Sequence, residues 1–322
     1  MTTNKIILKS KNETKLASIA RLEELTKNYA QQSLSFSTRK FYAIDCRIFA
    51  NWCKSHQFEV MPALSQVAAA FIADQAANGI APSTLNRRLA AIKLAHESAG
   101  YESPTKDKLV QATMSGIKRA SQRVKVKKSP ATAERIESMI AYCPETLPGL
   151  RDKALLLLGF GGAFRRSELV ALTINDIERT PEGIKVTIRK SKTDQEGKGH
   201  AIAIPNGAHF RIVDVLLAWL KAANITDGHL FRSIKKGSKV QTKALTDRSV
   251  ANIVKHYANK AGFTVDDFSG HSLRSGFLTS AARAGASPFK MMEISRHKSI
   301  ETLAAYIRSE NLFAEHAGEK FL

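Results

Sequence analysis

The apolar residues of this chain recur at two different spacings, and this change of period restricts the fold more than any other feature. In the first 121 residues they recur in steps of three and four, as with Leu16, Ile19 and Leu22, which is typical of amphipathic helices. After residue 130 helical patterns continue, but the runs 184–188 and 202–204 alternate strictly. Alternation around a polar, Gly-containing segment predicts a β-hairpin with a long loop. We therefore expect a mainly α protein with one small β-sheet, an α+β fold.

The length of the chain and a break in its helical patterns predict two domains. At about 100–200 residues per domain, 322 residues suffice for two, and Ser129-Pro130 interrupts the helical patterns. The predicted segments are a flexible N-terminus over 1–13, a helical bundle over 14–121, a basic linker over 122–130, a second domain over 131–310 and a C-terminal tail over 311–322.

The chain is strongly basic. It has 49 Lys and Arg against 29 Asp and Glu, which gives a formal net charge of +20. The run 118–128 holds six cations and no acid. Such a run attracts polyanions by neutralising phosphates and releasing counterions, although a solvated linker would have the same composition. It lacks the interleaved Trp, Phe or Leu of a membrane-binding segment.

The composition and the lengths of the apolar runs also exclude several classes of protein. The hydrophobic fraction of 43% and the charged fraction of 24% are those of a folded globular protein. Three cysteines cannot build a disulfide framework, and the first residues do not resemble a secretory signal. The longest apolar run, Ala154–Phe164, is shorter than the roughly 20 residues of a membrane span. We expect a cytoplasmic, nucleoid-associated protein with no membrane partner.

Five segments after residue 130 carry side chains that could bind or attack a phosphate. Each alone is ordinary, because an isolated Arg, Lys, His or Tyr is more often structural or solvated. In chain order the candidates are Arg165, which follows a Gly-rich turn and precedes Glu168; Lys192 in the hairpin loop; His271 and Arg274 on one helix face; His297; and Tyr306.

Together these residue types fit one reaction. Two arginines can clamp a phosphodiester and balance the charge that grows in its transition state. Histidines can move protons, a lysine can protonate a leaving oxygen, and a tyrosine hydroxyl can act as nucleophile in a cationic site. No metal-binding cluster of carboxylates accompanies them, so we expect no metal and no cofactor.

The order and spacing of these segments resemble the tyrosine recombinases, the phage integrase family. Arg165-x-Ser-Glu-Leu resembles the first box of that family, and His271-Ser-Leu-Arg274 resembles its H-x-L-R box. The segment 296–306 is similar to the third box, with Tyr306 nine residues after His297. The resemblance extends over roughly residues 15–320.

The resemblance implies a site-specific recombinase or integrase, of the kind carried by mobile genetic elements. Arg165 and Arg274 would bind the scissile phosphate, His271 would assist proton transfer, and His297 would hydrogen-bond a non-bridging oxygen. Tyr306 would attack to form a 3′-phosphotyrosyl bond, while Lys192 would protonate the 5′-oxygen. That bond conserves the energy of the broken phosphodiester, so ATP would not be needed.

The resemblance also implies an assembly on DNA. Each chain would close around duplex DNA as a C-shaped clamp, formed by a core-binding domain and a catalytic domain. Four protomers would hold two paired recombination sites and exchange strands through a four-way junction, an arrangement compatible with accessory DNA-bending proteins. The tail would dock on a neighbouring protomer. The expected DNA-binding residues are Asn86, Arg87, Arg88, Lys93, Lys118, Arg119, Arg123, Lys125, Lys127, Lys128 and Arg296.

The role of one residue that departs from the family pattern is undecided, and so is the choice between this function and two alternatives. Arg296 stands where the family usually has Gly before its third-box histidine, so it is either a further DNA contact or a change of local backbone geometry. A catalytically silent DNA-binding clamp and an enzyme like the type IB topoisomerases are the alternatives. The presence of Tyr306 argues against the first, and the N-terminal helical bundle argues against the second.

Overall fold

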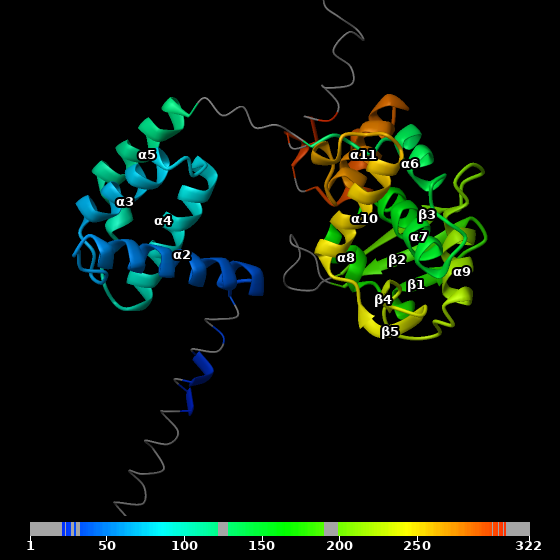
Figure 1. Ribbon diagram of the computed structural model, residues 1–322, viewed down its shortest axis with the longest axis horizontal. Coiled ribbons are helices and arrows are strands. Elements are labelled where there is room, and N and C mark those ends of the chain that lie inside the picture. The colour runs from blue at the N-terminus through cyan, green and yellow to red at the C-terminus, as the bar shows by residue number, and fades with distance from the viewer. Residues whose placement is uncertain are drawn as a thin grey trace, which may run out of the picture. The chain divides into compact units, whose positions relative to one another are not determined.

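The computed structural model describes residues 21, 22, 24–26, 29, 33–121, 128–189, 199–297, 299–301, 303, 304 and 306. The chain divides into two compact units, Met1–Lys125 and Val126–Leu322 (Figure 1). Helices dominate both units and the second also holds short strands, so the predicted fold class is confirmed. Most of residues 14–31, the first part of the predicted helical bundle, lie outside the described residues. No helix in the described ranges is long and apolar enough to cross a bilayer.

The first unit is a bundle in which α2 packs on α4 and α3 packs on α5. The Ser35 hydroxyl caps the first of these helices by accepting the N–H of Thr38, and the Asp107 carboxylate caps the last by accepting the N–H of Leu109. The elements are α2 (Phe36–Ser55), α3 (Ser65–Ala77), α4 (Pro82–Ser98), the 3₁₀ turn η1 (Pro104–Lys106) and α5 (Lys108–Ala120).

The core of this bundle is apolar but encloses one carboxylate. Phe49 of α2 meets Phe71 of α3 edge to face, with ring centroids 5.1 Å apart. Asp45 lies one helical turn before Phe49 and is fully buried. It is paired there with two arginines of α4, Arg87 and Arg88. A buried carboxylate needs such partners, so it ties α2 to α4 at this position.

The second unit, Val126–Leu322, combines helices with two small sheets. Its elements in the described ranges are α6 (Ala133–Ile140), α7 (Leu147–Gly161), α8 (Arg166–Ala171), η2 (Ile174–Asp176), β1 (Ile177–Arg179), β2 (Gly183–Ile188), β3 (His200–Pro205), α9 (Ile212–Ala222), β4 (Arg232–Lys235), β5 (Lys239–Ala244), α10 (Asp247–Lys260), η3 (Val265–Asp267), α11 (Ser272–Arg283) and α12 (Pro288–Ser295).

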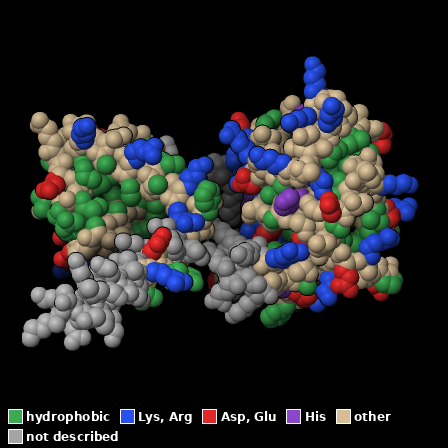
Figure 2. All heavy atoms as spheres, turned by 90° about the horizontal axis from the view of Figure 1, so that it is seen from below, with side chains coloured by type: hydrophobic (Ala, Val, Ile, Leu, Met, Phe, Trp, Pro, Cys, Tyr) green, Lys and Arg blue, Asp and Glu red, His purple; other side chains and the backbone are tan. Residues whose placement is uncertain are grey.

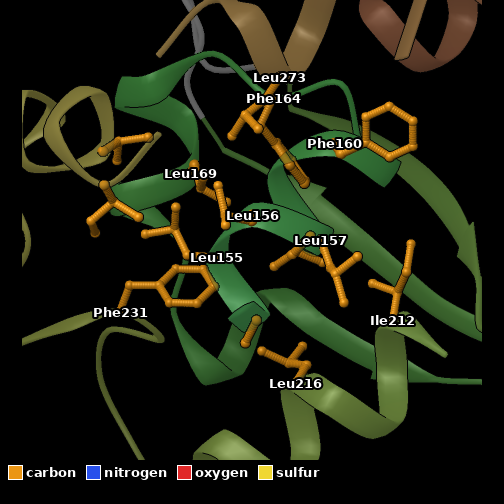
Figure 3. Close-up of a cluster of buried hydrophobic side chains, with 14 of the residues drawn as sticks. Leu155, Leu156, Leu157, Phe160, Phe164, Leu169, Ile212, Leu216, Phe231 and Leu273 are labelled. Carbon is orange, nitrogen blue, oxygen red and sulfur yellow. The ribbon is translucent and has the colours of Figure 1, made fainter. Parts of the chain in front are cut away.

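Helix α7 is the centre of this unit. The four leucines 155–158 are fully buried, so the helix is apolar on every side and must be enclosed. Helices α6, α8, α9, α10 and α11 all contact it. Figure 3 shows Leu155, Leu156 and Leu157 among side chains from other elements, including Leu216 of α9 and Phe231. Arg165 and Arg274 therefore lie on elements that pack on this core, whereas Met291 of α12 packs with Leu278 and Leu303 in a smaller cluster.

The strands form two separate antiparallel sheets. β2 pairs with β1 and with β3, and Ile184 lies opposite Ile204. The inward residues of these strands are buried, which confirms the predicted hairpin; its loop over 190–198 lies outside the described residues. The sequence predicted one small sheet, whereas the structure adds β1 and a second sheet, β4–β5. The residues of β4 and β5 range from buried to exposed without a regular alternation, and their sequences lack an apolar alternation.

The turn after α7 brings the first candidate residue to the surface of the core. A Cβ on Gly162 would lie 2.1 Å from the ring of Phe164, so only glycine lets that ring fold beneath the turn. Ala163 follows with a φ of 45°, in the left-handed region. This conformation costs a non-Gly residue roughly 1–2 kcal/mol, and its buried carbonyl points toward the candidate site, where it accepts two guanidinium groups.

We expect Leu156→Ala to lower the free energy of unfolding of the second unit by about 2–5 kcal/mol, because it leaves a cavity in the enclosed helix. Urea unfolding followed by circular dichroism measures this change. Phe289→Ala is the control, since that side chain is 77% exposed and its removal should have little effect. A loss below about 1 kcal/mol at Leu156 would contradict the central position of α7.

Candidate active site

Arg165 is held at the start of α8 by a buried carboxylate. Glu168 Oε2 accepts the backbone N–H of Arg165 at 2.9 Å, and Glu168 Oε1 accepts Arg165 Nη1 at 2.6 Å. Glu168 is only 3% exposed. Burial would raise its pKa, but Arg296 and then Arg165 outweigh this and lower it, so the carboxylate is ionised at neutral pH. The guanidinium of Arg165 is thus fixed at the edge of the core.

Arg274 enters the same site from α11 and is 1% exposed. Its Nη1 donates to the carbonyl oxygen of Ala163 at 2.8 Å, and its Nη2 lies 3.3 Å from Nε2 of His297. Burial, followed by the charges of Arg165 and Arg296, lowers the pKa of Arg274 to about 9. No described carboxylate pairs with this guanidinium directly. The site therefore holds a buried cation that an anion would stabilise.

His271 and Tyr306 meet at the exposed side of this cluster. Nε2 of His271 lies 3.4 Å from the Tyr306 hydroxyl. Partial burial of the His271 ring, with Arg274 and Arg165 nearby, lowers its pKa below the usual value. Burial raises the pKa of Tyr306, although Arg274 acts in the opposite direction. A neutral imidazole thus lies beside a protonated phenol, which is the arrangement of a base and its proton donor.

His297 follows α12 and closes the cluster. Its Nδ1 lies 2.8 Å from the hydroxyl oxygen of Ser295, which also lies within hydrogen-bond distance of the carbonyl oxygen of Met291. The ring centroid of His297 is 6.3 Å from that of Tyr306. Burial, then the charge of Arg274 and those of Arg165, His271 and Arg296, lowers the pKa of His297 to about 4. The imidazole is therefore neutral at pH 7.

The structure thus brings together five of the six residues for which the sequence predicts a catalytic role: Arg165, Arg274, His271, His297 and Tyr306. The sixth, Lys192, lies outside the described residues. Within the described ranges, no three His, Cys, Asp or Glu side chains are grouped as metal ligands. The cluster can bind a monoanion between two guanidinium groups and present a hydroxyl to it.

The expected DNA-binding residues fall into distinct environments. Asn86, Lys93, Lys118, Arg119 and Lys128 are exposed, and Figure 2 shows Lys and Arg side chains on the visible face of each unit. Lys93 is close to Glu97, and Lys128 donates to the carbonyl oxygen of Asp266. The remaining linker cations, Arg123, Lys125 and Lys127, lie outside the described residues.

Two of the expected DNA contacts on α4 are engaged within the protein. Arg87 is half-buried, donates twice to Asp45 at 2.7 and 3.1 Å, and stacks over the ring of Phe41. Arg88 is 7% exposed and donates to Gln75. The sequence held a signal for this pairing, because Asp45 lies on the apolar stripe of its helix, four residues from Phe41 and from Phe49. Of the three adjacent residues 86–88, Asn86 is the exposed one.

Arg296 is also buried rather than displayed to solvent. It is 8% exposed, and its Nη2 donates to Glu168 Oε2 at 2.8 Å. Its backbone is left-handed, with φ 59° and ψ 39° at the C-terminal cap of α12. The arginine thus occupies the conformation that glycine adopts without strain, at a cost of roughly 1–2 kcal/mol. Of the two alternatives raised by the sequence, this burial favours the structural one over a direct DNA contact.

Comparison with known proteins agrees with this geometry. The model of the phage integrase family matches residues 131–312, more than half of the chain. The chain belongs to the phage integrase family. It is 38% identical to an integrase/recombinase XerD homolog of Selenomonas ruminantium over 98% of this chain and 95% of that protein. It is 22% identical to the recombinase Cre of Escherichia phage P1 over 87% of this chain and 86% of Cre.

Solved structures show the same fold. The integrase of the Tn1549 transposon, solved in complex with transposon right end DNA, superposes with a TM-score of 0.60 at 18% identity, over 88% of this chain and 92% of that chain. The family match and the named relatives confirm the predicted class of enzyme, a tyrosine-type site-specific recombinase.

We expect the imidazole of His297 to titrate with a midpoint near 4 in the folded chain, and that of His271 to titrate below 6.5. A folded-state pKa below the unfolded value means that protonation opposes folding. The contribution of His297 to stability is therefore present above pH 6.5 and is lost as the pH falls toward 4.

An NMR titration of the histidine ring protons tests this expectation, with His297→Asn and His271→Asn supplying the assignments. A midpoint for His297 at or above 6.5 would show that the ring is not desolvated beside the guanidinium groups.

Proposed function

We propose that this chain cuts and rejoins double-stranded DNA at specific sites through a 3′-phosphotyrosyl intermediate at Tyr306. The observation that carries the proposal is the 3.4 Å approach of His271 Nε2 to the Tyr306 hydroxyl, beside the buried guanidinium of Arg274. A binding protein needs the cations but has no use for a hydroxyl paired with a neutral imidazole. A nucleophile needs both.

In the proposed reaction Arg165 and Arg274 hold the two non-bridging oxygens of the scissile phosphate. The cations stabilise the charge that develops as the phosphorus gains a fifth ligand. His271 accepts the phenolic proton as the Tyr306 oxygen forms its bond to phosphorus. His297 donates a hydrogen bond to a non-bridging oxygen from the tautomer that carries its proton on Nε2, in which Nδ1 accepts the Ser295 hydroxyl.

The 5′-oxygen leaves as the bond between it and phosphorus breaks, and Lys192 supplies its proton. Attack by a 5′-hydroxyl of the partner duplex then reverses these steps and releases Tyr306. The phosphotyrosyl ester has the same kind of bond as the phosphodiester it replaces, so the cycle needs no ATP.

The two units would divide the work. Residues 14–121 form the DNA-binding domain and residues 131–310 the catalytic domain, with the linker 122–130 along the phosphate backbone. Four protomers hold two sites, exchange strands through a four-way junction, and contact one another through the tail 311–322. The contacts to DNA come first from the exposed residues Asn86, Lys93, Lys118, Arg119 and Lys128.

Covalent capture tests the proposal. Duplexes from around the gene of this chain, tiled and nicked so that the cleaved strand diffuses away, should give a protein–DNA adduct on a denaturing gel. Tyr306→Phe should abolish the adduct, because it removes the attacking oxygen but keeps the ring. Tyr257→Phe is the matched control: its hydroxyl contacts Asp152 in the core, away from the cluster.

The outcomes separate the alternatives. An adduct that persists in Tyr306→Phe would exclude Tyr306 as the nucleophile. Tight DNA binding with no adduct on any tile would favour the silent clamp. Relaxation of a supercoiled plasmid that lacks the captured site would favour an enzyme like the type IB topoisomerases.

Binding to the captured site should weaken steeply with salt. Each phosphate contact releases counterions, so the logarithm of the association constant should fall by roughly 0.9 per contact for each tenfold rise in salt. Fluorescence anisotropy at several salt concentrations measures the slope. Lys118→Ala should lower the slope by about one contact, whereas Lys221→Ala, an exposed change on α9, should leave it unchanged. A flat salt response would contradict a DNA-binding function.

A further inference from the structure

Arg296 connects three parts of the site that are far apart in the sequence. It caps α12 directly before His297, and its side chain reaches the turn after α7 and the first turn of α8. Nη1 donates to the carbonyl oxygens of Gly162 and Ile294, at 3.3 and 2.7 Å. Nη2 donates to the carbonyl oxygen of Ala163 at 3.1 Å and to Glu168 Oε2 at 2.8 Å.

Two of these four acceptors also hold another residue of the cluster. The carbonyl oxygen of Ala163 accepts Arg274 as well, and Glu168 Oε2 accepts the backbone N–H of Arg165. Arg296 therefore shares one acceptor with each of the two arginines that would bind the phosphate. Its own guanidinium lies over the ring of Phe164, 5.3 Å from the centroid, within the core. It is shielded from any ligand that approaches the exposed side of the site.

We propose that Arg296 is a positioning residue for the strand-cleavage step: it fixes His297 relative to Arg165 and Arg274 through Ala163 and Glu168, without touching DNA. This inference rests on the proposed function. A planar guanidinium suits the role because it offers donors in a fixed fork, and four acceptors from three segments surround it.

The left-handed backbone at Arg296 supports a role for the side chain itself. Glycine would occupy this position without strain, whereas the arginine adds four hydrogen bonds from its Nη1 and Nη2 atoms, which offset the strain. Replacement by glycine should therefore preserve the path of the backbone and remove only the guanidinium. Asparagine also tolerates this conformation and provides a second, independent variant.

The test compares Arg296→Gly and Arg296→Asn with the wild-type chain on the captured DNA site. The rate of adduct formation at saturating protein should fall, by up to about a hundredfold, because small displacements of reacting groups slow a reaction strongly. The dissociation constant for DNA should stay within about threefold of wild type, since Arg296 makes no DNA contact in this proposal. A role in folding alone would not separate rate from affinity in this way.

Arg211→Gly is the matched control. Arg211 also has a left-handed backbone, with φ 47° and ψ 50°, but its side chain is 69% exposed and pairs with Asp214 on the surface. The same substitution there removes a guanidinium from the same backbone conformation, outside the site. It should leave both the cleavage rate and DNA affinity unchanged.

A double-variant cycle tests whether Arg296 acts through Glu168. If it does, Arg296→Gly combined with Glu168→Gln should cleave about as slowly as Glu168→Gln alone, because residues in one network are not additive. If the losses of cleavage rate in the two single variants add up in the double variant, Arg296 does not act through Glu168. It would then act through Ala163 alone, which contradicts the proposal.

Three further outcomes would overturn the inference. Wild-type rates in both folded variants would show that Arg296 positions nothing. Equal losses of rate and DNA affinity would make it a direct DNA contact. Failure of the wild-type chain itself to form an adduct on any tile would overturn the proposed function and, with it, this role. An adduct from wild type with unaffected variants overturns the inference alone.

Discussion

A single buried carboxylate makes the cationic cluster of the second unit compatible with a folded core. Glu168 is 3% exposed and contacts the guanidinium groups of Arg165 and Arg296, at 2.6 and 2.8 Å. Uncompensated buried charge is expensive, and two arginines at the edge of an apolar core would repel each other. Glu168 forms an ion pair with each of them and so connects α8 to the end of α12. The positions of Arg165 and His297 both depend on it.

The carboxylate can act in this way because the surrounding elements are rigid. Helix α7 is enclosed on all sides, and the turn that follows it carries a glycine under an aromatic ring and a left-handed Ala163. The carbonyl oxygen of Ala163 is consequently fixed where both Arg274 and Arg296 can donate to it. A backbone oxygen held by core packing is a more precise anchor than a mobile side chain. The left-handed backbone of Ala163 is strained, and this strained conformation is what directs its carbonyl oxygen to the two arginines.

The sequence predicted the residues of the cluster better than their supports. Residues such as Arg165 and Tyr306 could be found because their types and spacing are distinctive. The role of Ala163 could not, since any residue supplies a carbonyl oxygen and its direction depends on the local φ and ψ. The sheet β4–β5 was missed because its strands have no regular alternation of burial and therefore no apolar alternation in the sequence.

Burial of charge was the hardest feature to predict. Arg88 and Arg296 look like DNA contacts in a basic sequence, yet each is less than 9% exposed and has partners within the protein. The sequence distinguishes a buried arginine from an exposed one only where an acidic residue interrupts the apolar stripe of a helix that could pack against it. Asp45 does so for Arg88, and it lies 43 positions away in the sequence. For Arg296 no acid interrupts an apolar stripe in this way, and its partner Glu168 lies 128 positions away in the sequence.

The charge balance of the cluster connects these structural details to the chemistry. Among the described residues that contact one another there, Arg165, Arg274 and Arg296 are opposed by Glu168, which leaves an excess of two positive charges. Burial lowers the pKa of His271 and of His297 most, and the charges of Arg274 and Arg165 lower both pKa values further. A phosphodiester carries one negative charge, and a second develops on its equatorial oxygens when a nucleophile adds. A site with two uncompensated cations is therefore matched to the transition state more closely than to the bound substrate, which is the condition for electrostatic catalysis.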